Sequence, residues 1–129
     1  MLESVFLSNP ERILDRNDLA LTINQYGYEV SPGHCLVLPL RVVETVWEMT
    51  TEEWLACIAL LRRAKGRLDS GGNPPDGYNI GVNCLAAAGQ TILHAHIHLI
   101  PRYVGDHPNP KGGVRAVIPN KADWTKPDS

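Results

Sequence analysis

The hydrophobic and polar positions of the chain predict five short strands. Leu19, Leu21 and Ile23 occupy every second position of one stretch, which is the period of a half-buried strand. The stretch 35–40 (CLVLPL) is apolar throughout, which is typical of a buried strand. The other expected strands span 12–16, 77–83 and 91–100, and loops containing Gly, Pro and Asn separate most of them.

A single long helix is predicted after residue 50. Thr50 can cap its N-terminus, and Glu53 follows three positions later, which is the spacing of a capping box. The helical period continues to about Asp69, with the basic residues largely on the side expected to face solvent. The expected apolar stripe comprises Trp54, Leu55, Ile58, Leu61 and Leu68. Because strands outnumber helices and follow one another in meander-like pairs, the expected fold class is α+β.

Composition narrows the kind of protein. The chain has 129 residues, the size of one ordinary domain, and 43% of them are hydrophobic, which is enough for a packed core. Lys and Arg number 12 against 14 Asp and Glu, so no overall positive field favours nucleic-acid binding. No apolar stretch is long enough to span a bilayer, and no signal peptide is expected. We therefore expect neither a nucleic-acid nor a membrane partner.

The cysteines favour a reducing compartment. Cys35, Cys57 and Cys84 are odd in number and far apart in the sequence. No Cys-x-x-Cys pair is present, so neither a disulfide framework nor a thiolate zinc site is indicated. A cytoplasmic location is the resulting expectation.

The strongest chemical signal is a row of histidines in the last predicted strand, HAHIHLIPR. His94, His96 and His98 occupy every second position, so they share one face of a strand. The apolar residues between them face the other way, towards the core. The row is therefore expected to form one wall of a site.

Three interpretations of this row compete. Solvent-exposed strand residues would explain one histidine but hardly three in strict alternation. A metal site could use a His-x-His pair, but the first and third Cα atoms would lie about 13 Å apart in a strand. No acidic residue lies between Tyr78 and Tyr103 to complete such a site. Phosphate chemistry is the third interpretation, in which a neutral imidazole attacks through one nitrogen while a backbone carbonyl holds the other.

The loop before the row fits the third interpretation best. Gly89, Gln90 and Thr91 lie just upstream, where small residues let backbone N–H groups and the Thr91 hydroxyl approach a phosphate. The flanking histidines could bind phosphoryl oxygens and protonate a leaving group. This interpretation explains both the row and the loop.

These residues also resemble a known family. The pattern Gly89-Gln90-Thr91-x-x-His94-x-His96-x-His98-x-x-Pro101-Arg102 resembles the signature of the histidine triad nucleotide hydrolases and transferases. The similarity includes Ser31-Pro32-Gly33-His34, the long helix after Thr50 and the stretch 76–83. It covers roughly residues 11–103, and the extended tail 104–129 resembles a bacterial subgroup. We accordingly expect a single domain, 1–129.

The resemblance implies a fold and a reaction. The fold is a small antiparallel sheet with one long helix packed on it, and two copies form a homodimer with a continuous sheet. In the reaction, the middle histidine attacks the α-phosphate of a nucleotide derivative and forms a nucleotidyl-histidine. Water then releases a nucleoside monophosphate. Substrates of the family include dinucleoside polyphosphates, nucleoside phosphoramidates and adenylated conjugates.

The same resemblance implies roles for single residues. His96 takes the position of the nucleophile, and His94 and His98 take the flanking positions. His34 matches the histidine that supports the site after a Pro-Gly turn. The substrate-binding positions fall on Asn83, Gly89, Gln90 and Thr91.

The chain departs from the family pattern at two places. The family's ribose-binding position falls on Tyr26, so we assign the ribose contact to the nearby amide of Asn24. Related bacterial members begin with a Cys-x-x-Cys zinc pair, whereas this chain has Ser4-Val5-Phe6-Leu7. We therefore expect no metal site and no required cofactor; a divalent cation could assist only by binding a polyphosphate substrate.

Three functions remain open from the sequence. The first is a nucleotidyl hydrolase with a covalent histidine intermediate. The second is a phosphorylase, which transfers the nucleotidyl group to phosphate instead of water. The third is a nucleotide-binding module whose residual hydrolysis is not its purpose.

Overall fold

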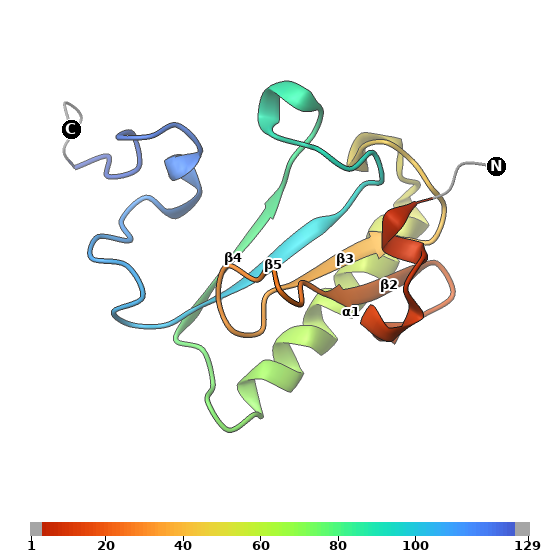
Figure 1. Cartoon of the computed structure of the whole chain (residues 1–129), viewed down its shortest axis with the longest axis horizontal. Coiled ribbons are helices and arrows are strands. Elements are labelled where there is room, and N and C mark those ends of the chain that lie inside the picture. Colours follow the sequence, from red (N-terminus) through yellow and green to blue (C-terminus); the bar gives the residue numbers. More distant parts are fainter. Residues whose placement is uncertain (1–3, 126–129) are drawn as a thin grey trace.

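The structure, a computed structural model, describes residues 4–125 and shows one antiparallel sheet with one long helix against it (Figure 1). The strand order is β1-β2-β3-β5-β4. The strands are β1 (Ile13–Arg16), β2 (Ala20–Asn24), β3 (Cys35–Pro39), β4 (Gly77–Val82) and β5 (Ile97–Arg102), and the helix is α1 (Thr51–Asp69). Short 3₁₀ turns complete the chain: η1 (Val5–Leu7), η2 (Pro10–Arg12), η3 (Val46–Glu48), η4 (Ala86–Ala88) and η5 (Gly113–Val117). The expected α+β class is confirmed.

Helix α1 begins with the predicted capping box but buries a different stripe. The Thr50 hydroxyl accepts the backbone N–H of Glu53 at 3.1 Å, and the Glu53 carboxylate accepts that of Thr50 at 2.9 Å. The predicted stripe was wrong at Leu55 and Ile58, which are 60% and 38% exposed. The buried positions are Glu53, Cys57, Leu60 and Ala64. Small Cys57 and Ala64 side chains let the helix approach the sheet closely, and Glu53 tolerates burial because Arg41 pairs with it at 2.6 Å.

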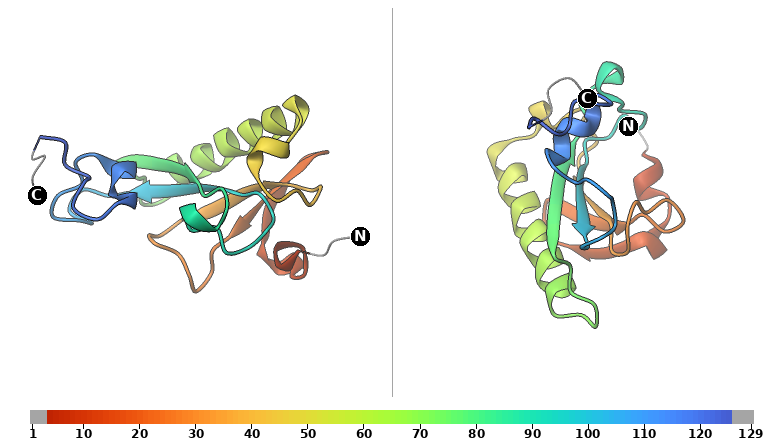
Figure 2. Two further views of the ribbon diagram at one scale, coloured as in Figure 1. Left: turned by 90° about the horizontal axis from the view of Figure 1, so that it is seen from above. Right: turned by 90° about the vertical axis from the view of Figure 1, so that its left-hand side faces the viewer.

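The two faces of the sheet carry different layers. Leu99 packs with Cys35 and Ala64 on the face covered by α1. His98 pairs with Leu36 of β3 and Gly81 of β4, and directly paired residues share a face, so these side chains lie on the opposite face. The N-terminal arm, residues 4–8, covers part of this second face, where Phe6 packs with Leu21, Ile23, Leu36 and Leu38. Figure 2 shows α1 and the arm on opposite sides of the sheet.

The last strand is shifted from its predicted position. The sequence predicted a strand over 91–100, whereas β5 runs from Ile97 to Arg102. The register that pairs Val37 with Ile97 would place Pro39 opposite Ala95. Pro39 has no N–H to donate, and its carbonyl accepts the His94 side chain at 2.7 Å. The ladder therefore stops, and the N–H of Ala95 bonds to the carbonyl of Val43 instead.

The tail after β5 folds back beside the sheet. Its turn η5 contacts β4, and Figure 1 shows the tail near the end of the β4–β5 pair. Among the residues that the structure describes, no helix is both long and apolar enough to cross a membrane.

Candidate active site

Four histidines converge on the sheet face opposite α1. His34 precedes β3, His98 lies within β5, and His94 and His96 belong to the extended segment before β5. The ring centroids of His96 and His98 are 5.3 Å apart, and those of His34 and His98 are 5.2 Å apart. The structure thus brings together all four histidines that the sequence singled out.

His96 is held with one ring nitrogen free. Its Nδ1 lies 2.7 Å from the backbone carbonyl oxygen of His94, and a carbonyl can only accept, so Nδ1 carries a proton. Burial lowers the pKa of His96, so the ring is neutral near pH 7 and Nε2 keeps its lone pair. The arm residue Phe6 packs edge-on against this ring, with centroids 4.8 Å apart. An oriented, neutral imidazole with one free nitrogen has the form that nucleophilic catalysis requires.

His34 fixes the tautomer of His98. The backbone N–H of Val30 donates to Nδ1 of His34 at 3.0 Å, so His34 carries its proton on Nε2. That Nε2 lies 2.9 Å from Nδ1 of His98 and donates to it. Burial, followed by the neighbouring His96 and His34, lowers the pKa of His98 to about 4. Neutral His98 therefore carries its one proton on Nε2, as a hydrogen-bond donor.

His94 has both nitrogens occupied inside the protein. Its ring is fully buried, with Nε2 donating to the carbonyl of Pro39 at 2.7 Å. Its Nδ1 lies 2.7 Å from the hydroxyl of Ser4, and burial lowers the pKa of His94, so neutral Nδ1 accepts from this hydroxyl. The backbone carbonyl of His94 also accepts the Nδ1–H of His96, so His94 orients the neighbouring ring.

This arrangement bears on the alternative of a metal site. A histidine binds a metal through a ring-nitrogen lone pair, and Nε2 of His94 directs a proton at a carbonyl instead. Over residues 4–125, no group of three or more His, Cys, Asp or Glu side chains is placed to hold a metal ion. The Ser4–His94 hydrogen bond involves the first residue of the stretch 4–7. This stretch stands in place of the Cys-x-x-Cys zinc pair that the family resemblance would lead one to expect.

The side chain of Gln90 makes hydrogen bonds that hold the loop between β4 and the histidines. Its side-chain oxygen accepts the N–H of Leu85 at 2.7 Å, and its amide donates to the carbonyls of Glu44 and Ile92 at 2.6 and 3.1 Å. Gln90 is buried, whereas Thr91 is exposed. Gly89 adopts a φ of +92° and Leu85 a φ of +73°, a conformation that strains a leucine. Gln90 thus shapes the predicted phosphate loop through its own hydrogen bonds.

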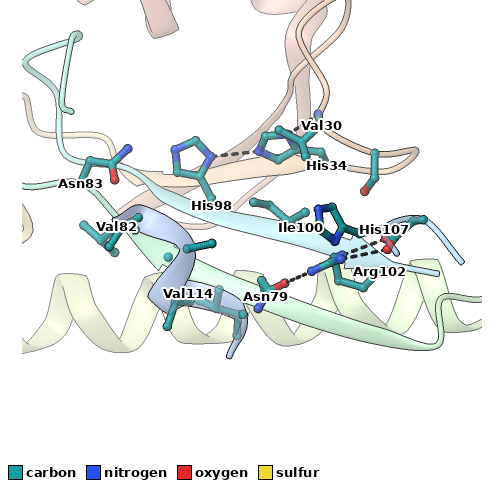
Figure 3. Close-up of a pocket in the computed structure, with 17 residues that line it drawn as sticks. Val30, His34, Asn79, Val82, Asn83, His98, Ile100, Arg102, His107 and Val114 are labelled. Carbon is teal, nitrogen blue, oxygen red and sulfur yellow. Dashed lines mark hydrogen bonds and ion pairs between the residues drawn. The ribbon is translucent and has the colours of Figure 1, made fainter. Parts of the chain in front are cut away.

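The two predicted asparagine contacts lie in different places. Asn83 follows β4 and lines the cavity beside His98 (Figure 3). Asn24 pairs with Cys35, whose side chain packs on the α1 face, and its side chain accepts the N–H of Tyr26 at 3.0 Å. Asn24 therefore lies on the α1 face of the sheet, opposite the face that carries His98.

Sequence comparisons now identify the family. Residues 8–105, more than half of the chain, match the sequence profile of the HIT domain. The chain belongs to the HIT family.

Individual relatives of this HIT protein are matched over part of their length. It is 34% identical over 85 residues to the AP-4-A phosphorylase of Mycobacterium tuberculosis (strain ATCC 25618 / H37Rv), covering 65% of this chain and 42% of that protein. It is 38% identical over 80 residues to the Bis(5'-adenosyl)-triphosphatase of Dictyostelium discoideum, covering 62% and 53% respectively. The chain thus spans about half the length of these curated relatives.

A solved structure shares the fold. The crystal structure of a protein from Streptococcus mutans UA159 matches with a TM-score of 0.72 and 28% identity, covering 84% of this chain and 71% of that one. The fold predicted from the resemblance, a small antiparallel sheet with one long helix, is therefore confirmed for this HIT protein.

A cavity of about 780 Å³ extends from His98 and His34 along β4 and β5 to the tail of the HIT protein (Figure 3). Sequence reasoning missed most of its wall. The missed residues include Val30, Asn79, Ile100, Arg102, His107, Val114 and Val117. The period of two offered a signal for some, because Ile100 and Arg102 continue the alternation of His98. No comparable signal existed for the tail residues, whose position depends on how the tail folds back.

Proposed function

We propose that this protein is a nucleotidyl hydrolase that cleaves at the α-phosphate of a nucleotide derivative through a covalent intermediate on His96. The observation that carries the proposal is the hydrogen bond from Nδ1 of His96 to the carbonyl of His94, which leaves Nε2 free to attack. The named activities of the two curated relatives, a phosphorylase and a triphosphatase, support nucleotide phosphoanhydrides as one substrate class. Nucleoside phosphoramidates share the same α-phosphate and are the second class.

The geometry suggests how the first step proceeds. Nε2 of His96 forms a bond to the α-phosphorus while the bond from phosphorus to the leaving group breaks. The Nδ1–H of His96 keeps its hydrogen bond to the carbonyl of His94, and this hydrogen bond stabilises the positive charge that the ring acquires. The leaving atom takes the electron pair of the broken bond, and the Nε2–H of His98 donates a hydrogen bond to it. An amine leaving group also takes up one proton from solvent as it departs.

The second step restores the enzyme. A water oxygen bonds to the α-phosphorus, one water proton passes to solvent, and the phosphorus–nitrogen bond breaks with its electron pair returning to Nε2 of His96. A nucleoside monophosphate is released. In the alternative transfer reaction, inorganic phosphate takes the place of water, as the name of the mycobacterial relative indicates for that protein.

The test is to trap the intermediate. Rapid acid-free quenching of turnover with a nucleotide labelled at the α-phosphate should leave an acid-labile, hydroxylamine-resistant label on His96. His96→Ala should lose several orders of magnitude in turnover but far less nucleotide affinity. Label on Cys84, or near-normal turnover of His96→Ala, would overturn the proposal.

Two further assays separate the alternatives. Product analysis with and without inorganic phosphate distinguishes a hydrolase from a phosphorylase. Turnover of a phosphoramidate, which has no polyphosphate to bind a cation, is expected to survive a chelator. Loss of that turnover on chelation with recovery on adding zinc would favour the metal interpretation. Binding without turnover of any compound would favour a nucleotide-binding module.

A further inference from the structure

The proposed function leaves open which part of the substrate occupies the cavity beside His98. Its wall includes His98, whose Nε2–H is the proposed donor for the leaving atom. A group leaving the α-phosphate beside His98 therefore has the cavity as its nearest space. Figure 3 shows Asn83 on one side of His98, and His34 and then Arg102 with its partners on the other side.

The rest of the wall is mainly aliphatic. β5 contributes Ile100, β4 contributes Val82, and η5 contributes Val114 and Val117 from the tail. Val114 and Val117 are 58% and 77% exposed, although both are aliphatic. An apolar ligand between these walls would remove apolar surface from water on both sides.

The single arginine in the cavity wall is already neutralised. Its Nε and Nη2 donate to the two carboxylate oxygens of Asp106, each at 2.8 Å. Its Nη1 donates to the side-chain oxygen of Asn79 at 2.7 Å. All three nitrogens of Arg102 thus face protein acceptors, and the pair carries no net charge.

Two histidines of the wall are held neutral, because burial lowers the pKa of His34, and burial together with neighbouring histidines lowers that of His98. Among the described wall residues, Arg102 is the only lysine or arginine, and its donors already bond to protein acceptors. No lysine or arginine in this wall is therefore available for a charged ligand. A polyphosphate leaving group carries several negative charges and needs such cations.

We propose that this cavity binds the leaving group of the substrate, that it favours an uncharged, largely apolar one, and that Val114 and Val117 of the tail determine this specificity. The inference rests on the proposed function, because the leaving group exists only if the α-phosphate is attacked beside His98. Among the substrate classes considered above, it selects phosphoramidates of apolar amines over compounds that release a polyphosphate.

The test compares two adenosine 5'-phosphoramidates whose amines differ only at the far end. One carries phenylethylamine and the other phosphoethanolamine, so the bond that breaks is the same type. Burial of the phenyl ring removes apolar surface from water, so wild-type kcat/KM should favour the phenylethyl compound by roughly tenfold or more. A ratio at or below one overturns the inference and leaves the proposed function intact.

Matched substitutions in the tail sharpen the test. Val114→Lys places a cation in the wall and should lower the kcat/KM ratio about tenfold. Ile118→Lys, at a position 59% exposed but outside the cavity, should leave the ratio unchanged. Equal changes in both variants would overturn the role of Val114. Because both substrates are measured on the same preparation, the kcat/KM ratio is unaffected by any loss of folded protein.

A failure of the proposed function and a failure of this inference give different results. If neither phosphoramidate is turned over but a dinucleoside polyphosphate is, the proposed function stands and the inference is overturned. If none of these compounds is turned over, the proposed function fails, and the two phosphoramidates are measured by calorimetric binding to the unmodified protein. Tighter binding of the phenylethyl compound, reduced by Val114→Lys alone, would still support the specificity of the cavity. Equal or reversed affinities would overturn it.

Discussion

The hydroxyl of Ser4 lies 2.7 Å from Nδ1 of His94, although 90 positions separate the two residues in the chain. The same hydroxyl accepts the N–H of Phe6 at 3.3 Å. Phe6 in turn is buried against His96, the proposed nucleophile. One hydrogen bond therefore holds the N-terminal arm against the histidine row and positions the Phe6 ring beside His96.

Replacing Ser4 by Ala should reduce stability. The change leaves Nδ1 of His94 buried without its hydrogen-bond donor, which costs about 1–3 kcal/mol. Urea unfolding monitored by tryptophan fluorescence gives the free energy of unfolding. Ser8→Ala is the matched control, because the Ser8 hydroxyl bonds to the carbonyl of Val5 on the surface, and it should change stability by less than about 0.5 kcal/mol. Equal effects of the two changes would contradict the anchoring role of Ser4.

Replacing His34 by Asn should lower kcat more than it raises KM. His34 is a positioning residue, because its Nε2–H holds His98 in the tautomer that donates from Nε2. Loss of that hydrogen bond should reduce kcat roughly 10²-fold, within the range of general acid–base groups. Steady-state kinetics on a phosphoramidate measures kcat and KM separately. Tyr28→Ala is the control, because Tyr28 lies in the exposed loop before His34. A change confined to KM would mean that His34 only binds substrate.

The free energy of unfolding should fall as the pH is lowered from about 6.5 towards 4. The folded-state pKa of His98 is about 4, below its ordinary value of 6.5, so the unfolded chain binds more protons in this interval. The pKa values of His34, His94 and His96 are lowered as well, which adds to the same slope. Urea unfolding at a series of pH values tests this, and His98→Gln should flatten the curve. A stability that rises on acidification would be inconsistent with buried, neutral histidines.

Replacing Leu85 by Gly should stabilise the loop before the histidines. Leu85 has a φ of +73°, which glycine adopts without strain, and its side chain is 52% exposed. Relief of strain should raise the free energy of unfolding by about 1 kcal/mol. Leu93→Gly is the control in the same loop, since Leu93 is 58% exposed without a positive φ, and it should destabilise instead. Thermal or urea denaturation compares the pair, and destabilisation by both would argue against strain at Leu85.

We expect the protein to be a homodimer, as the family resemblance implies. β4 is an end strand of the sheet, and Ile80 in its middle is 55% exposed. Light scattering at micromolar concentration should report about twice the chain mass of 14.2 kDa. Ile80→Asp should produce monomers, whereas Leu14→Asp at β1, the other end of the sheet, should not. An active wild-type monomer would remove the claim.

Local patterns predicted most of the elements. The capping box at Thr50 and Glu53 located the start of α1, and the apolar run from Cys35 located β3. These features depend on neighbours in the sequence, so the chain specifies them without knowledge of the fold. The stripe of α1 was misassigned because hydrophobicity alone ranks Leu55 above Cys57 or Ala64, whereas contact with the sheet favours the smaller side chains.

The alternation of histidines along one segment, and the loop of small residues before it, follow directly from the order of residues in the chain. The hydrogen-bonding role of each histidine follows from the folded arrangement instead, because a tautomer depends on its partner atoms. The carbonyl of Pro39 and the hydroxyl of Ser4 occupy His94, while Val30 acts through His34 on His98. These partners come from distant parts of the chain, and the packing of the arm, β3 and β5 brings them together. The cavity wall formed by Val114 and Val117 likewise exists only because the tail folds back beside β4.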